Sequence, residues 1–197
     1  HLRPSQLVRG QCLHEREPTR WTQQNVPALK SRGHYLMDTI LKNKSFITIK
    51  EIKFTPELKE KITTALGVGK AIEAEENSKK IQGFEFSYLS NGKKIAGLLA
   101  VPSSISQEKL PCIIYNRGGY KDFSRWRHGA LFSNFGKLVK DRYVVIASQY
   151  SGNSLSEGKD EYGGQDVDDV IALYDILKAL PFIDTERVGM YGGSRGA

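Results

Sequence analysis

With 197 residues, of which 39% are hydrophobic, the chain is long enough for one domain with a buried core and too short for two ordinary domains. It contains no apolar run of about 18 residues, which argues against a membrane-spanning helix. The net charge of +7 raises the question of nucleic-acid binding, but residues 1–36 supply +4 of it through six basic and two acidic residues, and charge gathered in an unpatterned segment is weak support for a binding surface.

Residues 1–36 show no sustained period of 2 or 3.6 residues and are rich in Arg, Gln, Pro and His. We interpret them as a basic extension, a tag or a disordered tail, with Met37 as a candidate natural start. An export signal upstream of His1 stays open, and we favour a cytoplasmic location. A nucleic-acid contact made by this tail ranks last among the hypotheses. It would weaken steeply with salt and disappear on deletion of the segment.

Residues 37–80 are predicted to be a lead-in of helices and a strand. A strand is expected over 48–54, and a helix follows it. Thr55 can cap this helix, Pro56 suits its first position, and Gly67 suits its end. Residues 71–80 are expected to be a polar helix or a linker.

A hairpin is predicted from residue 81 onward. Aromatic residues alternate with polar ones over 84–88, which is the period of a half-buried strand. Asn91 and Gly92 tolerate the positive φ of a tight turn, and a second strand returns over 95–101. The unbroken apolar run 112–115 predicts a strand covered on both faces. Cys112 in it is expected to be a small buried hydrophobe, and neither cysteine of the chain has a partner at disulfide or metal-ligand spacing.

The remaining elements alternate between helix and strand. Helices are expected over 130–140 and 166–180, and strands over 143–147 and 187–191. The apolar stripe of the second helix is predicted to consist of Val167, Val170, Ile171, Tyr174 and Leu177. This order predicts the α/β class, with a mostly parallel sheet, helices on both faces and an antiparallel hairpin at its entry.

The last strand runs directly into Gly192-Gly193-Ser194-Arg195-Gly196, which has the G-x-S-x-G spacing of a nucleophile elbow. A nucleophilic serine must sit on a strained turn between a strand and a helix, so that its hydroxyl stands clear of the sheet. Small residues two before and two after it, here Gly192 and Gly196, avoid a clash across that turn. The strand that precedes the motif supports this interpretation over an incidental glycine-rich turn.

Residues 81–197 resemble the catalytic domain of the α/β-hydrolase superfamily, in particular the prolyl-oligopeptidase-like (S9) peptidases and their dienelactone-hydrolase and acyl-esterase relatives. Four stretches carry the likeness, besides the elbow: 117–119, 143–147 followed by 150–152, 163–170 and 181–189. The resemblance implies that Ser194 is the nucleophile. It also implies that the backbone N–H groups of Gly119 and Arg195 form the oxyanion hole.

Two positions depart from the family pattern. Arg117 stands where a histidine is common, which preserves the glycine geometry and changes what flanks the acyl pocket. Ser151 stands where an arginine is frequent.

The triad order implied by the family is Ser, then Asp or Glu, then His, but only three residues follow Ser194. The four histidines are His1, His14, His34 and His128. His128 follows the oxyanion glycines and is on the wrong element for a general base. We therefore expect the 197-residue chain to be a fragment that is inactive unless completed.

The leading hypothesis is a serine hydrolase that cleaves a carboxylic ester or a peptide bond, with a small-substrate esterase or a minimal peptidase favoured. The alternative is a non-catalytic α/β-hydrolase-like protein that acts as a binding or interaction module. We expect no metal or organic cofactor, since no ligand cluster or dinucleotide fingerprint is present, and the elbow lacks the Lys-Ser/Thr ending of a phosphate loop. No nucleic-acid or membrane partner is expected, and the oligomeric state stays open.

Overall fold

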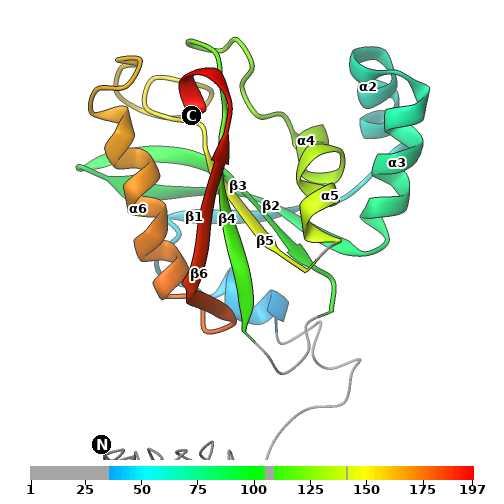
Figure 1. The fold of residues 1–197 in the computed structure, drawn as a ribbon, viewed down its shortest axis with the longest axis horizontal. Helices are drawn as coiled ribbons and strands as arrows, with labels where there is room; N and C mark the ends of the chain where they lie inside the picture. The colour runs from blue at the N-terminus through cyan, green and yellow to red at the C-terminus, as the bar shows by residue number, and fades with distance from the viewer. Residues whose placement is uncertain (1–35, 105–108, 141) are drawn as a thin grey trace, which may run out of the picture.

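A computed structural model of the chain describes residues 36–104, 109–140 and 142–197. The expectation for residues 1–35 lies outside this part. The described residues form one six-stranded sheet with the strand order β1-β2-β3-β5-β4-β6 (Figure 1). Its elements are β1 (Thr48–Ile52), α2 (Pro56–Leu66), α3 (Val68–Ser78), β2 (Ile81–Ser90), β3 (Lys93–Pro102), β4 (Leu110–Asn116), α4 (His128–Phe132), α5 (Asn134–Val139), β5 (Val144–Ser148), α6 (Asp166–Lys178), β6 (Ile183–Gly192) and a 3-10 turn η1 (Ser194–Gly196).

The elements with local sequence signals form as predicted. The Thr55 hydroxyl caps α2 by accepting a hydrogen bond from the Leu58 N–H, and Gly67 ends that helix at φ 89°. Asn91 and Gly92 take φ values of 46° and 74° and connect β2 to β3. The segment left open between helix and linker is the helix α3.

The sheet is mixed over the described residues rather than mostly parallel. β1, β2, β3 and β5 pair antiparallel, whereas β5 with β4 and β4 with β6 pair parallel. The reason is that the hairpin contributes three antiparallel pairings: β2 pairs with β3, β1 adds to the outer side of β2, and β3 joins β5. The parallel part predicted by the alternation of strands and helices is confined to β5, β4 and β6, and these strands carry the site.

Helices cover both faces of the sheet, as predicted for the α/β class. On one face, α6 and residues 36–46 pack against β2, β3, β4 and β5. On the other face, α2 to α5 pack against the alternate side chains of the same strands. Val144 and Ile146 point to the first core, and Val145 and Ala147 point to the second. This two-sided burial explains the continuous apolar runs of the central strands.

The helix predicted over 130–140 is two short helices, α4 and α5, which meet at Ser133. The Ser133 hydroxyl donates to the Gly129 carbonyl oxygen, an interaction that competes with regular helix geometry. The Phe132 carbonyl oxygen, which would accept from the next turn of a continuous helix, instead accepts from the Asn77 side chain at 2.8 Å. Asn77 comes from α3, so the break is caused by a tertiary contact.

The buried stripe of α6 differs from the predicted one. Val170 and Leu177 are buried as predicted, but Val167, Ile171 and Tyr174 are 39–57% exposed. The buried face instead contains Asp166, Asp169, Val170, Leu173, Ile176 and Leu177. The helix is turned this way because two carboxylates that periodicity assigns to the solvent face have partners inside the protein, described below.

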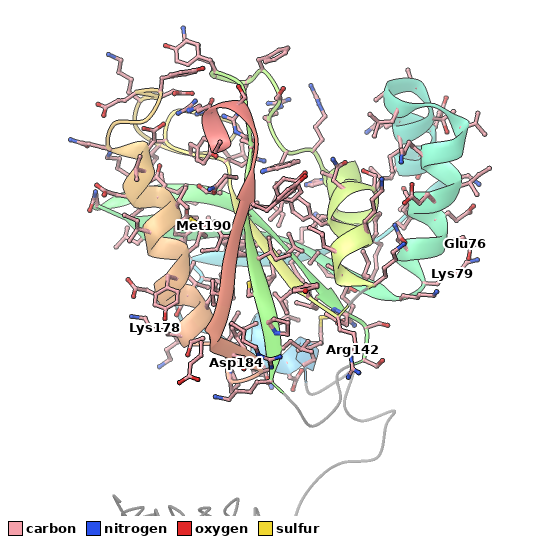
Figure 2. The ribbon with its side chains drawn as sticks, viewed as in Figure 1. Glu76, Lys79, Arg142, Lys178, Asp184 and Met190 are labelled. Carbon is pink, nitrogen blue, oxygen red and sulfur yellow. The ribbon has the colours of Figure 1, made fainter. Side chains whose placement is uncertain are left out.

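β6 is the sheet edge opposite β1, and it pairs only with β4 among the described residues. Met190 extends from β6 on its α6 side (Figure 2) and is 64% exposed.

Candidate active site

Two turns meet at the carboxyl ends of the neighbouring parallel strands β4 and β6. Asn116, at the end of β4, is in register with Gly192, at the end of β6. The turns that follow are therefore side by side. A Cβ placed on Gly118 would lie 3.1 Å from the Gly193 carbonyl oxygen and 3.5 Å from the Ser194 Cβ. The two motifs singled out in the sequence, which lie about 75 residues apart, are thus in contact.

The turn after β6 has the geometry that the G-x-S-x-G spacing anticipates. Ser194 has φ 58°, in the left-handed region that costs a non-glycine residue about 1–2 kcal/mol, and it begins η1. A Cβ on Gly192 would overlap the Gly196 carbonyl oxygen, and one on Gly196 would lie 2.6 Å from the Asn116 carbonyl oxygen. Gly193 has open space around it. The glycines two before and two after the serine are therefore the ones that the backbone requires.

The turn after β4 is built around Gly119, which has φ 80°. A Cβ there would overlap the Phe123 carbonyl oxygen. Within the described part of the chain, the backbone N–H groups of Gly119 and Arg195 donate to no protein group. The two N–H groups that the sequence points to are thus free to bind a ligand oxygen.

Arg117, which stands where the related family often has histidine, is 1% exposed. Its guanidinium lies over the Tyr150 ring, with 5.0 Å from Cζ to the ring centroid. Every hydrogen bond that it donates within the described residues goes to a backbone carbonyl oxygen: Gly118, Lys121, Phe123 and Gln149 accept, at 2.9–3.3 Å. Burial lowers the pKa of Arg117 from its usual value. The side chain therefore lies inside the turn rather than along an open pocket.

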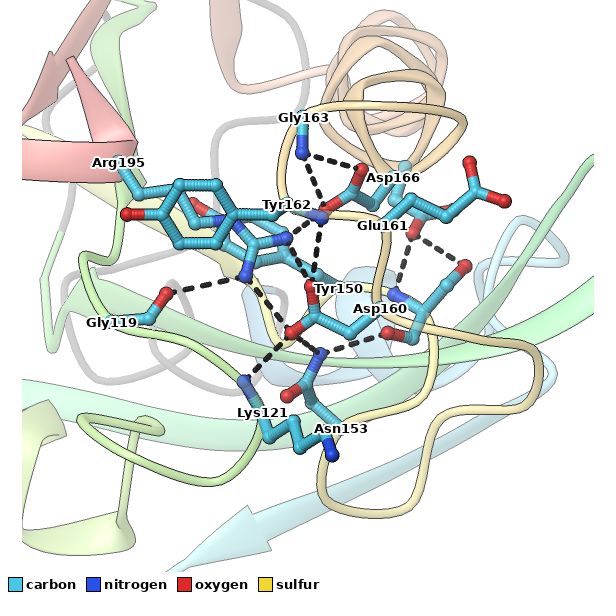
Figure 3. A network of polar contacts seen from close by, with 12 residues as sticks. Gly119, Lys121, Tyr150, Asn153, Asp160, Glu161, Tyr162, Gly163, Asp166 and Arg195 are labelled. Carbon is cyan, nitrogen blue, oxygen red and sulfur yellow. Dashed lines mark hydrogen bonds and ion pairs between the residues drawn. The ribbon is translucent and has the colours of Figure 1, made fainter.

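The Arg195 side chain lies at the centre of a buried polar network (Figure 3). It forms ion pairs with Asp160 and Asp166, and all three side chains are at most 5% exposed. Its Nη1 also donates to the Gly119 carbonyl oxygen at 3.2 Å. Its Cζ lies 4.9 Å and 5.0 Å from the ring centroids of Tyr150 and Tyr162. Arg195 thus ties the elbow to the turn after β4 and to the loop before α6.

Asp160 organises the same network from the loop between β5 and α6. Burial alone would raise the pKa of its carboxyl. Hydrogen bonds from Arg195, from the Asn153 amide and from the backbone N–H groups of Lys121 and Tyr162 outweigh that effect and hold the pKa well below its usual range. Asp160 is therefore ionised at neutral pH and bridges two loops.

The two buried carboxylates of α6, Asp166 and Asp169, both have partners at the end of the sheet that carries the site. Asp166 pairs with Arg195, and Asp169 accepts hydrogen bonds from the backbone N–H and the hydroxyl of Ser151, at 2.7 and 2.8 Å. The apolar stripe predicted from the sequence contains neither aspartate. The roles of Tyr150 and Asp160 had no local signal, because Arg117, Lys121 and Arg195, with which they interact, are distant in the chain.

No general base for Ser194 lies among the described residues. His128, the one histidine of the described ranges, begins α4 and has its Nε2 3.2 Å from a carboxylate oxygen of Glu85 on β2. The His128 side chain is 43% exposed and so lies on the surface. Residues 1–35 contain the other histidines.

A cleft of about 190 Å³ lies beside the elbow and opens on its α6 side, lined by Tyr150, Ile171, Met190 and Arg195, among others. A second hollow, of about 530 Å³, lies between the turn after β4 and the loop of residues 152–160, and its lining contains no residue of the elbow. The first cleft is therefore the one placed to receive part of a substrate bound at Ser194.

Within the described part of the chain, no group of three or more His, Cys, Asp or Glu side chains could hold a metal ion. Cys112 is buried, and burial raises the pKa of its thiol strongly. No described helix is long and apolar enough to cross a bilayer.

The chain is similar to proteins of a known family. Residues 132–197 match the family model described as "Prolyl oligopeptidase family". The uncharacterized peptidase YtmA of Bacillus subtilis (strain 168) is 31% identical over 119 residues, which are 60% of this chain and 44% of that protein. Dipeptidyl-peptidase 5 of Porphyromonas gingivalis is 27% identical over 119 residues, covering 53% of this chain and 16% of that protein. The chain thus spans less than half the length of these two relatives.

Solved structures agree on the fold. An acetyl xylan esterase from Paenibacillus sp. R4 is 16% identical with a TM-score of 0.51, and the match covers 91% of this chain and 58% of that one. The esterase Est22 is 17% identical with a TM-score of 0.51, over 74% of this chain and 47% of that one. At these identities the likeness concerns the fold alone, and it is that of the α/β-hydrolases.

Proposed function

Because the chain has an α/β-hydrolase fold and its residues 132–197 match the prolyl oligopeptidase (S9) family model, we propose that the protein is a serine hydrolase that cleaves a carboxylic ester or a peptide bond through an acyl-enzyme on Ser194. The observation that carries the proposal is the contact between the two turns. Ser194 stands at φ 58° on the strand-to-helix turn, and Gly118 and Gly119 lie directly against it.

In the proposed reaction, the Ser194 Oγ attacks the substrate carbonyl carbon, and the carbonyl oxygen becomes an oxyanion. The free N–H groups of Gly119 and Arg195 donate to that oxyanion. The serine proton passes through a base to the leaving alcohol or amine, and the acyl group stays on Ser194. Water then attacks the acyl-enzyme, which releases the acid and restores the hydroxyl.

In this proposal the described residues supply the nucleophile and the oxyanion donors, and none of them is assigned the role of the base. The 197-residue chain on its own is therefore proposed to be inactive unless completed, since a serine hydroxyl keeps its proton near neutral pH without a neighbouring base. Robust ester hydrolysis by the purified 197-residue chain would contradict this part of the proposal.

The relatives leave two candidates for the cleaved bond, a peptide bond and a carboxylic ester. Both curated relatives carry peptidase names, which supports peptide bonds. The two solved structures named above are esterases, but at 16–17% identity they are evidence for the fold only. A small ester and an aminoacyl amide should therefore be compared directly.

The test is a pre-steady-state measurement on the protein expressed from its complete reading frame. With p-nitrophenyl acetate we expect a burst of about one nitrophenolate per enzyme, because acylation of Ser194 precedes slower deacylation. An aminoacyl p-nitroanilide series, followed as the steady release of p-nitroaniline because acylation by an amide is normally the slow step, reports peptidase activity. Steady turnover without acylation of Ser194 would contradict the mechanism, and no turnover of either substrate class would favour the non-catalytic binding module.

A further inference from the structure

Two consecutive peptide groups of the turn after β4 are each held by a different guanidinium. Arg117 Nη1 donates to the Gly118 carbonyl oxygen at 3.2 Å. Arg195 Nη1 donates to the Gly119 carbonyl oxygen, also at 3.2 Å. The two arginines come from the two turns that make the site, and both stack on the ring of Tyr150.

The bond to the Gly118 carbonyl has a consequence for the neighbouring N–H group. A peptide unit is planar, and in its trans form the C=O and N–H bonds point in opposite directions. The described residues contain no cis peptide bond. The carbonyl of Gly118 and the N–H of Gly119 belong to one peptide unit. Holding that carbonyl toward Arg117 therefore directs the Gly119 N–H away from Arg117.

This turn is a place where such a restraint matters. Glycine has little steric preference between opposite orientations of its peptide groups, and Gly118 and Gly119 adjoin one another. A flipped Gly118–Gly119 peptide would present a carbonyl oxygen where a donor is needed, and a carbonyl repels an oxyanion. The N–H of Gly119 has no other described partner that would keep it in place.

Arg117 is itself held firmly enough to act as the restraint. Its Nε and Nη2 donate to the Gln149 carbonyl oxygen, at 3.3 and 3.2 Å, and Nη2 also donates to the Lys121 carbonyl oxygen at 2.9 Å. Its own carbonyl oxygen accepts from the Tyr150 hydroxyl at 3.0 Å. A planar guanidinium with a fixed fork of donors can hold several carbonyls in one geometry, which a lysine ammonium cannot.

We propose that Arg117 is a positioning residue of the oxyanion hole: its hydrogen bond to the Gly118 carbonyl keeps the Gly119 N–H turned toward the oxyanion that forms at Ser194. The inference rests on the proposed function, because it needs an oxyanion at that place. Arg195 restrains the next peptide unit, at the Gly119 carbonyl, and so limits the motion of the same turn from the side of the elbow.

The test compares R117M and R117K with the matched control R125M in the protein from its complete reading frame. Arg125 belongs to the same loop and pairs with Asp122 on the surface, outside the site. Each kcat is divided by the number of sites that react with a fluorophosphonate, so that misfolded protein is not counted. Loss of one oxyanion donor lowers kcat by about 100-fold or more, so we expect R117M to lose about that factor, with KM changed by less than about threefold.

R117K should fall between R117M and the wild type, because one ammonium group replaces the forked donor. R125M should keep kcat within about twofold of the wild type, as a surface substitution does. A trifluoromethyl ketone, which forms a tetrahedral oxyanion on the serine, should lose affinity in R117M in proportion to kcat/KM. A purely structural role of Arg117 would lower the melting temperature and the number of reactive sites but would leave kcat per site and this correlation unchanged.

A wild-type kcat per reactive site in R117M overturns the inference. If R117M does not fold, R117K decides in the same way, and R117H tests the residue that the related family often carries there. Failure of the proposed function gives a different result, because the wild-type protein would then contain no fluorophosphonate-reactive Ser194 to count.

Discussion

Two glycine-containing turns of this protein obey different constraints. In the β2–β3 hairpin, Gly92 takes φ 74° and a Cβ there would meet nothing within 4 Å. Where the two site turns cross, Gly192 and Gly196 have no positive φ, yet a Cβ on either would run into backbone atoms. Glycine is needed at position 92 because the backbone of that residue has a positive φ. Gly192 and Gly196 are needed because two chain segments approach each other closely, and only the folded sheet brings those segments together. We call this place, where the turns after β4 and β6 meet, the crossing.

The largest effect that sharpens this comparison is expected for S194A. If the crossing exists to present Ser194, removal of its hydroxyl should lower kcat by about 10⁴-fold or more. The control is S154A, because Ser154 also has a positive φ, 55°, but is exposed and lies outside the crossing. Steady-state hydrolysis of the best substrate measures both variants, and an S194A enzyme with wild-type turnover would contradict the account.

G192A should strongly destabilise the protein, because its methyl group would overlap the Gly196 carbonyl oxygen and the backbone would have to move. We expect a loss of about 3 kcal/mol in the free energy of unfolding, measured in urea. G189A is the matched control on the same strand, since a Cβ on Gly189 meets nothing within 4 Å. It should stay within about 0.5 kcal/mol of the wild type. Equal losses in the two variants would show that the close approach is not what matters.

D160N should break the network that joins the loops of the crossing. Removing one partner of a buried ion pair typically costs about 3 kcal/mol, and we expect a loss of that order at pH 7. D175N is the control, because the Asp175 side chain is 74% exposed in its pair with Lys178. Its loss should be below about 1 kcal/mol.

The pH dependence of the free energy of unfolding gives a second test of Asp160, in which the wild type is compared with D160N. Hydrogen bonds depress the folded pKa of Asp160 below the ordinary value of 3.8, so the stabilisation is fully present above about pH 5 and is lost as the pH falls through and below 3.8. The wild type should therefore lose stability more steeply than D160N below about pH 4. Parallel acid transitions of the two proteins would contradict the assignment.

The smallest effect is expected for G92A in the hairpin. The residue has room for a methyl group, so only the positive φ is unfavourable, by about 1 kcal/mol. Urea unfolding should show this loss, and fluorophosphonate labelling per folded molecule should be unchanged. A loss as large as that of G192A would remove the distinction between the two kinds of turn.

The sequence predicts those parts of the fold whose causes are local. The caps of α2, the Asn91–Gly92 turn and the apolar strands are encoded within a few neighbouring residues. The predicted buried face of α6 was wrong at Val167, Ile171 and Tyr174. The helix instead buries two aspartates, whose partners are distant in the chain, and leaves these apolar residues exposed. The break at Ser133 was missed because Asn77 reaches it from another helix.

The same division holds for the site. The G-x-S-x-G spacing and the glycines after β4 identify the two turns that meet, and their roles in catalysis stay predictions. The side chains of Arg117 and Arg195 could not be placed from the sequence, since their partners lie in the turn after β4, in the loop between β5 and α6, and in α6 itself. Sequence reasoning assigned Arg195 a backbone role only, whereas its guanidinium joins Asp160, Asp166 and the Gly119 carbonyl oxygen in a buried polar network.

The measurement that tests the central claim most directly is fluorophosphonate labelling of the protein from its complete reading frame, followed by intact mass and peptide mapping. The account predicts one label per molecule, on Ser194, and no label in S194A. A label on another residue, or an unmodified Ser194 peptide in a folded protein, would contradict it.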